Sequence, residues 1–144
     1  MALPVLFLVR HAKAEPSSSA GDAARRLSKE GRERFRRQLA ALAGELHLRR
    51  IVTSPYARAA ETAALLAEAT GAPVDQDPRL ASGASDGRAL LRLAAEHGAG
   101  TALVGHNPEI AEAVHLAGAD GAEVPPGTVA ALGSDGRLAW LRPG

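Results

Sequence analysis

The segment Phe7-Leu-Val-Arg-His-Ala-Lys-Ala-Glu15 determines the fold expected for this chain. The residues before it continue the same apolar run, and an unbroken apolar stretch over residues 4–9 is typical of a strand buried on both faces of a parallel sheet. The run stops at Arg10-His11, so both polar side chains are expected at the carboxyl end of the strand. Ligands of parallel sheets bind outside this edge. The segment therefore predicts a parallel sheet with Arg10 and His11 at its ligand-binding edge.

Strand and helix patterns alternate along the rest of the chain, which indicates an α/β fold with a mostly parallel sheet. Further strands are predicted at 50–53 and 101–104, a weak extended piece at Val74, and a hairpin at 128–132 and 137–141. Helices are predicted from Ser28 to about Leu46, from Ser54-Pro55 to before Gly71, at 88–97, and from Asn107-Pro108 to about Ala117, with 79–87 as a loop. No linker or repeat divides the sequence, so a single domain over residues 1–144 is expected.

The proposed helix starts rest on capping patterns. Ser28 is the expected N-cap of the first helix. Ser54-Pro55 and Asn107-Pro108 each match an N-cap residue followed by proline at the first helical position. These two helices would then begin directly after the strands that end at Thr53 and Val104.

The bulk composition is that of an ordinary globular protein and excludes several classes. Apolar residues make up 46% and charged residues 23%, and the formal net charge of +1 gives no reason to expect nucleic-acid or membrane binding. The absence of cysteine excludes disulfide scaffolds, thiolate metal sites and cysteine nucleophiles. The apolar start lacks a basic leader and a small-residue cleavage site, which favours a buried strand and a cytoplasmic protein. A monomer is the default expectation.

Three predicted strands end at Val9, Thr53 and Val104–Gly105, and the cationic residues beside these ends are Arg10, His11, Arg58 and His106. Helix N-termini at the same edge would add free backbone N–H groups and a positive dipole end. Two arginines and two histidines in such a place predict a phosphate site. His106 and Glu109 lie three residues apart, but no further ligand completes a metal site, so none is expected.

The motifs resemble those of the histidine phosphatase (phosphoglycerate mutase-like) superfamily. They are Arg10-His11-Ala12, Ser54-Pro-Tyr-Ala-Arg58-Ala-Ala-Glu-Thr62 and Gly105-His106. The short chain, together with Arg26-Leu-Ser-Lys-Glu-Gly31 and Val104-Gly-His-Asn-Pro-Glu-Ile110, is similar to the compact SixA-type phosphohistidine phosphatases. The resemblance implies a phosphoglycerate mutase-like three-layer sandwich with helices on both faces of the sheet.

The resemblance also implies roles for the site residues. His11 would be the nucleophile and form a covalent phosphohistidine that water hydrolyses. Arg10 and Arg58 would hold the oxygens of the transferring phosphoryl group, and His106 would donate to the developing charge. Arg26 and Asn107 are additional candidates for substrate binding. No cofactor is expected, because the arginines neutralise the phosphoryl charge.

Two departures from the family pattern are visible in the sequence. Ala12 replaces the family glycine, which is acceptable if its φ is negative. The carboxylate with which larger relatives protonate an alkoxide leaving group has no clear equivalent, and Asp77 and Asp86 are the nearest candidates. A phosphoramidate can leave as neutral imidazole once its ring is protonated, so this gap favours phosphohistidine over phosphate esters.

The leading hypothesis is therefore a cofactor-independent phosphatase acting on phosphohistidine in proteins. One alternative is a small-molecule phosphomonoesterase that uses Asp77 or Asp86 as its acid. Another is a weakly catalytic module that binds phosphorylated partners, although simple binding does not need a nucleophile. Mutase activity is the least favoured, because little chain remains to enclose a phosphoglycerate.

Overall fold

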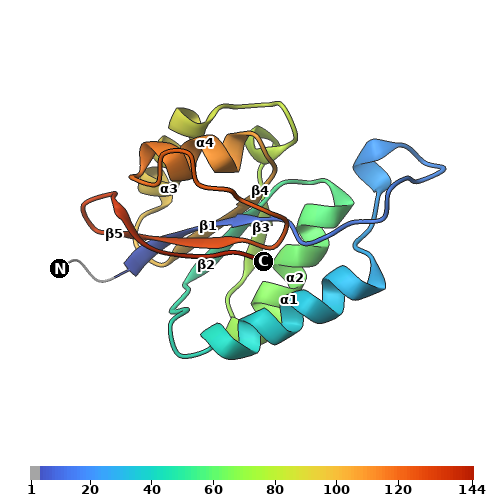
Figure 1. The fold of residues 1–144 in the computed structure, drawn as a ribbon, viewed down its shortest axis with the longest axis horizontal. Helices are drawn as coiled ribbons and strands as arrows, with labels where there is room; N and C mark the ends of the chain where they lie inside the picture. The colour runs from blue at the N-terminus through green and yellow to red at the C-terminus, as the bar shows by residue number, and fades with distance from the viewer. Residues whose placement is uncertain (1–3) are drawn as a thin grey trace.

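The structure, a computed structural model, describes residues 4–144; residues 1–3 of the apolar start lie outside the described part. One sheet contains, in spatial order, β3 (Val74–Gln76), β2 (Arg50–Thr53), β4 (Thr101–Gly105), β1 (Pro4–Arg10), β5 (Val129–Gly133) and β6 (Leu138–Arg142). The first four strands are parallel, and β5 and β6 are antiparallel to their neighbours (Figure 1). The mostly parallel sheet and the C-terminal hairpin are confirmed.

The helices form a layer on each side of the sheet. They are α1 (Lys29–Leu42), α2 (Ala57–Thr70), α3 (Gly87–His97) and α4 (Glu109–Leu116), with two 3₁₀ turns, η1 (Asp22–Ala24) and η2 (Pro78–Leu80). In Figure 1, α3 and α4 lie above the sheet and α1 and α2 below it. The three-layer α/β sandwich is therefore confirmed.

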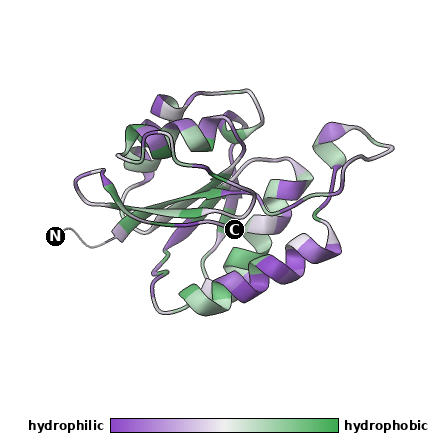
Figure 2. Ribbon diagram, in the orientation of Figure 1, coloured by the Kyte–Doolittle hydropathy of each residue, from purple (hydrophilic) through white to green (hydrophobic). Residues whose placement is uncertain are grey.

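Side-chain alternation along β1 divides the core between the two layers. Phe7 and Val9 pack with Phe35 on the side of α1 and α2, whereas Leu8 packs with Ile110 on the side of α4. Successive strand residues point to opposite faces, so a strand covered on both sides must be apolar throughout. Figure 2 shows this as a predominantly hydrophobic sheet between helices whose polar residues lie outward.

One predicted helix end is wrong. Helix α1 begins after its N-cap Ser28, whose hydroxyl accepts from Gly31 N, but it ends at Leu42 rather than near Leu46. A turn through Gly44 follows, and glycine is a poor helix former. Leu46 is nevertheless buried in the same core, so the apolar spacing was correct while the backbone conformation was not.

The two predicted Pro-based helix starts are also wrong by two residues or fewer. Helix α2 begins at Ala57 with Tyr56 at its N-cap, because the Ser54 hydroxyl accepts from Tyr56 N in a turn that precedes the helix. Pro108, which follows a cis peptide bond, is the N-cap of α4 rather than its first residue. The expected loop at 79–87 contains the last two residues of η2 and the first residue of α3.

The sheet register brings three strand ends level with one another. Val9 and Thr53 both pair with Val104, and Arg10 pairs with Gly105. The next residues along the three chains therefore leave the sheet at the same edge. Among the helices of the described residues, none combines the length and apolar character needed to cross a membrane.

Candidate active site

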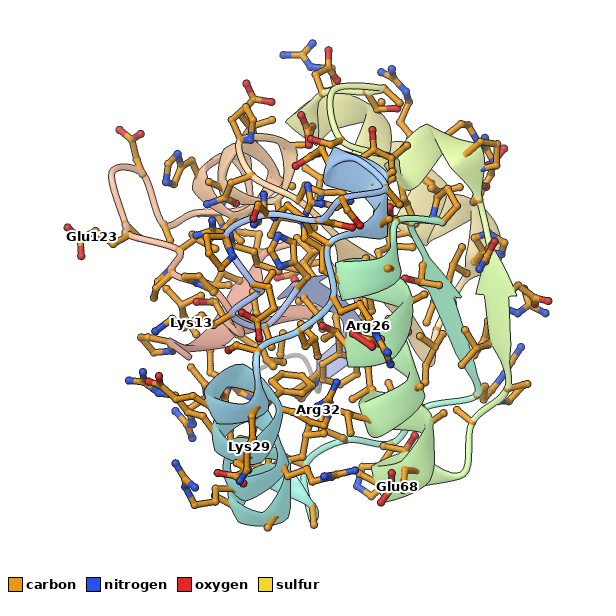
Figure 3. All side chains as sticks on the ribbon, turned by 90° about the vertical axis from the view of Figure 1, so that its right-hand side faces the viewer. Lys13, Arg26, Lys29, Arg32, Glu68 and Glu123 are labelled. Atoms are coloured by element: carbon orange, nitrogen blue, oxygen red, sulfur yellow. The ribbon has the colours of Figure 1, made fainter. Side chains whose placement is uncertain are left out.

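The backbone places the residues that follow the three strands in one row. His11 N donates to Gly105 O at 3.0 Å, and Ser54 N donates to Val104 O at 2.9 Å, so the ladder extends one residue beyond each strand. The ring centroids of His11 and His106 lie 5.2 Å apart as a result. Figure 3 views the molecule from this side, where Lys13 and Arg26 surround the edge.

His11 is held with one ring nitrogen available as a nucleophile. Its Nδ1 lies 2.7 Å from Ala12 O, and since a carbonyl only accepts, Nδ1 carries the proton and Nε2 keeps its lone pair. The side chain is only 7% exposed. Burial is the main cause that lowers the pKa of His11 to about 4; the hydrogen bond to Ala12 O is the next-largest effect and raises it, and the positive charges of Arg58 and Arg10 lower it by smaller amounts. The imidazole is therefore neutral and nucleophilic at pH 7.

His106 is oriented by Ser54. The Ser54 hydroxyl accepts from Tyr56 N at 3.1 Å and lies 2.8 Å from His106 Nε2, and we assign the hydroxyl proton to that nitrogen. The His106 proton then sits on Nδ1, which is buried and has no partner within residues 4–144. Burial, followed by the positive charges of His11, Arg58 and Arg10, lowers the pKa of His106 to about 3. His106 is thus a neutral donor with a free N–H group beside the His11 ring.

Arg10 is anchored at one end of its guanidinium. Arg10 Nη1 donates to Val124 O at 2.9 Å, and Asn107 Nδ2 donates to the same oxygen, also at 2.9 Å. Arg10 Nε is buried and has no partner among the described residues. Val124 and Asn107 therefore fix the position of Arg10 while its remaining donors stay available.

Arg58 projects from the first turn of α2 and is only 5% exposed. Its Nη1 donates to Asp22 O at 2.8 Å, its Nη2 lies 3.2 Å from Asp22 Oδ2, and its guanidinium carbon is 5.0 Å from the ring centroid of Tyr56. A cation at a helix N-terminus is unfavourable unless an anion balances it. In this structure the balancing anion is the Asp22 carboxylate.

Thr62 connects α2 to the segment after the nucleophile. Its hydroxyl donates to Arg58 O at 2.7 Å and accepts from Ala12 N at 3.0 Å. The backbone of Ala12 has no positive φ, so alanine is accepted at the position of the family glycine. Thr62, the last residue of the second motif, therefore has a structural role: its hydroxyl holds the backbone next to His11.

The two additional substrate-binding candidates have partners within the protein. Arg26 is exposed, with 73% of its side chain accessible, and its Nε pairs with Glu61 Oε2 at 3.0 Å. Arg25, rather than Arg26, is the neighbour whose charge lowers the pKa of His11. Asn107 uses its amide for Val124 and its oxygen to accept from Ala111 N. Contact of Arg26 or Asn107 with substrate stays a prediction.

The two candidate acids, Asp77 and Asp86, both accept hydrogen bonds from nearby backbone N–H groups. Asp77 accepts from Arg79 N, and hydrogen bonds from Arg79 lower the pKa of the Asp77 carboxyl. The Asp86 carboxylate is the N-cap of α3 and accepts from Ala89 N at 2.9 Å. Both carboxylates serve local structure. Among the described residues no group of three or more His, Cys, Asp or Glu side chains could hold a metal ion.

Sequence reasoning missed two groups of this site. Ser54 was interpreted as a helix cap, although its hydroxyl orients His106. Asp22 lies outside every predicted element and motif, although it is the carboxylate that contacts Arg58. The signal for Ser54 was its position directly after a strand end, like His11 and His106. No comparable signal marked Asp22, because 36 positions separate it from Arg58.

Comparisons with known proteins agree with this geometry. A protein of Agrobacterium tumefaciens described as a SixA phosphohistidine phosphatase is similar with a TM-score of 0.85 and 23% identity, covering 99% of each chain. A SixA protein histidine phosphatase complexed with tungstate gives 0.80 and 22%, covering 96% of each chain. A protein of Nakamurella multipartitia, also described as SixA, gives 0.76 and 27%, covering 96% of this chain and 95% of its own.

A search of curated protein sequences gave no significant match. The family model of the histidine phosphatase superfamily (branch 1) matches residues 6–109, which include His11, Arg58 and His106. This match extends over more than half of the chain, and the structural neighbours have the same three-layer fold. The chain therefore belongs to the histidine phosphatase superfamily, branch 1.

Proposed function

We propose that this protein is a phosphatase that removes phosphate from phosphohistidine in proteins, through a covalent phosphohistidine on His11. The observation that carries the proposal is the state of His11: a neutral imidazole whose Nδ1–H is bound to Ala12 O and whose Nε2 is free. The structures described as SixA phosphohistidine phosphatases cover nearly the whole chain and support the same substrate class.

In the first step the lone pair of His11 Nε2 forms a bond to phosphorus. The N–P bond of the substrate breaks, and its electron pair goes to the substrate nitrogen, which leaves as imidazole. Arg10 and Arg58 bind the phosphoryl oxygens with guanidinium donors, whose fork geometry suits phosphate. The free Nδ1–H of His106 adds a donor where negative charge develops.

In the second step water attacks phosphorus of the phosphorylated His11. The water oxygen forms a bond to phosphorus as the N–P bond to Nε2 breaks, the electron pair returns to Nε2, and inorganic phosphate leaves with both protons of the water. The division of one displacement into two is the usual advantage of a covalent intermediate. Arg10 and Arg58 balance the phosphoryl charge in both steps, and the neutral His106 contributes a hydrogen bond.

The absence of a poised acid favours phosphohistidine over phosphate esters. An alkoxide leaving group needs a proton, but Asp77 and Asp86 are held by Arg79 and by the N-terminus of α3. A protonated phosphohistidine ring leaves as neutral imidazole without any donor from the protein. The substrate class follows from this difference.

The decisive experiment compares three substrates: a protein phosphorylated on histidine, an aryl phosphate and a phosphoglycerate. Wild type is expected to prefer the phosphoprotein and to carry acid-labile phosphate when quenched during turnover. His11→Ala is expected to lose turnover by about a thousandfold or more and to trap no phosphate. Unchanged turnover in His11→Ala would exclude the covalent route, and hydrolysis of the esters alone would identify a phosphomonoesterase.

The proposal includes a monomeric, cytoplasmic enzyme whose partner is a phosphorylated protein, with no nucleic acid or membrane involved. Light scattering coupled to size exclusion tests the oligomeric state, with one species at the mass of one chain expected.

A further inference from the structure

We propose that Asp22 receives the leaving group: its carboxylate accepts a hydrogen bond from the second ring nitrogen of the substrate phosphohistidine. This inference rests on the proposed function and assigns a role to a residue outside the catalytic motifs. It is carried by the contacts of Asp22 with the phosphate-binding arginine and by its position on the open side of the site.

The carboxylate of Asp22 lies next to the place where phosphate would bind. Asp22 Oδ2 is 3.2 Å from Arg58 Nη2, and Asp22 Oδ1 is 3.0 Å from Arg25 Nη1. A phosphate oxygen that accepts from the same Arg58 guanidinium would lie about one hydrogen-bond length, ~2.8 Å, from it. The phosphoryl group and the Asp22 carboxylate would then be neighbours around one guanidinium.

Asp22 also lies on the side from which a leaving group must depart. His11 and His106 are buried beside the strand ends, whereas the Asp22 side chain is 60% exposed. Figure 1 shows the segment of η1, in blue, beyond the carboxyl ends of the strands. In-line displacement places the leaving group opposite the attacking nitrogen. With His11 attacking from the sheet edge, the substrate imidazole would face outward, toward η1.

The charge state of Asp22 suits a hydrogen-bond acceptor. The hydrogen bond from Arg25 is the main cause that lowers the pKa of the Asp22 carboxyl; partial desolvation opposes it, and the charge of Arg58 and its hydrogen bond lower the pKa further. The carboxylate is therefore ionised at pH 7 and accepts without donating. A carboxylate of this kind gives no proton to an alkoxide, so Asp22 does not supply the acid that phosphate esters need.

For a phosphohistidine the same carboxylate is useful. The phosphorylated ring leaves readily when its second nitrogen carries a proton, because the N–P electron pair then produces a neutral imidazole. An ionised carboxylate beside that N–H stabilises the protonated ring by charge and by a hydrogen bond. No proton is transferred: one N–P bond forms at His11 Nε2, one breaks at the substrate, and the N–H stays on the leaving imidazole.

A competing role would be purely structural. Asp22 also holds Arg58 through its backbone carbonyl, at 2.8 Å from Nη1, so its removal could simply displace the arginine. Asp22→Asn separates the two roles. The asparagine keeps the backbone carbonyl and a side-chain oxygen that accepts from Arg58, but it lacks the negative charge that would stabilise a protonated ring.

The test is therefore a ratio of rates. In Asp22→Asn, kcat/KM is measured for a phosphohistidine protein and for an aryl phosphate, whose leaving oxygen carries no ring N–H. The ratio of phosphohistidine to aryl phosphate turnover is expected to fall about tenfold to a hundredfold, the range of a charge-assisted hydrogen bond. Glu30→Gln, which removes an exposed carboxylate paired with Lys13, is the matched control and should keep the wild-type ratio.

An unchanged ratio overturns the inference, whether both rates fall together through loss of Arg58 positioning or neither rate changes. A failure of the proposed function is distinguishable, because wild type itself would then not hydrolyse the phosphohistidine protein. Turnover of the phosphoprotein by wild type together with an unchanged ratio in Asp22→Asn leaves the proposed function standing and rejects the role of Asp22.

Discussion

Replacement of Ser54 by alanine tests whether His106 acts as an oriented donor. In the structure the Ser54 hydroxyl lies 2.8 Å from His106 Nε2 and is assigned as the donor to it. Without the hydroxyl, the imidazole has no partner that keeps its proton on Nδ1. Ser54→Ala should therefore lower kcat while His106 itself is still present.

The size of the effect can be bounded. Removal of an oxyanion donor costs about 10²–10³ in kcat, and the alanine variant loses only the orientation of the donor, so a loss of about tenfold to a hundredfold in kcat is expected. A buried ring nitrogen left without a partner also destabilises the fold by about 1–3 kcal/mol. Single-turnover phosphate release and denaturant unfolding measure the two quantities separately.

Ser28→Ala is the matched control. Its hydroxyl makes a hydrogen bond of similar length, 2.9 Å, to Gly31 N at the start of α1. Loss of this N-cap should cost about 1 kcal/mol of stability and leave kcat unchanged. The reasoning on His106 is refuted if Ser54→Ala keeps wild-type kcat, or if Ser28→Ala loses as much kcat as Ser54→Ala.

The remaining predictions concern titration and close packing. By NMR, the His11 and His106 rings should titrate with midpoints of about 4 and 3, and midpoints near 6.5 would contradict their burial beside arginine. Because the folded-state pKa values of the two histidines are depressed, the unfolded chain binds more protons than the folded chain below pH 6.5. The free energy of unfolding should therefore fall as the pH drops from 6.5 toward 4, by up to about 1.4 kcal/mol per pH unit for each histidine. In urea titrations, His106→Asn should reduce this dependence of stability on pH. Gly31→Ala should destabilise the protein because the added Cβ would clash with Lys13 O. Gly44→Ala is the control, because open space surrounds that position. Equal Tm values for the two variants would be inconsistent with this packing.

The fold could be predicted because its signals are local. The apolar run before Arg10 has the character of a doubly covered strand, and Ser28 caps α1 as expected. The helix starts at Ser54-Pro55 and Asn107-Pro108 were misplaced by one or two residues: the Ser54 hydroxyl accepts from Tyr56 N and also contacts His106, and the Asn107 amide also donates to Val124 O. Capping propensity describes only near neighbours, and these contacts are set by tertiary structure.

The sequence alone determined the residue types of the site: a histidine after β1, an arginine in α2 and a histidine after β4. Only the tertiary structure decided their chemical states. The neutral state of His11 depends on burial and its tautomer on Ala12 O, and the proton assigned to His106 Nδ1 depends on Ser54, 52 positions away. The ionised carboxylate on Arg58 comes from Asp22, in a turn without a motif. Protonation, tautomer and pairing are set by groups that meet only when the strand ends align, and for this reason no single stretch of sequence encodes them.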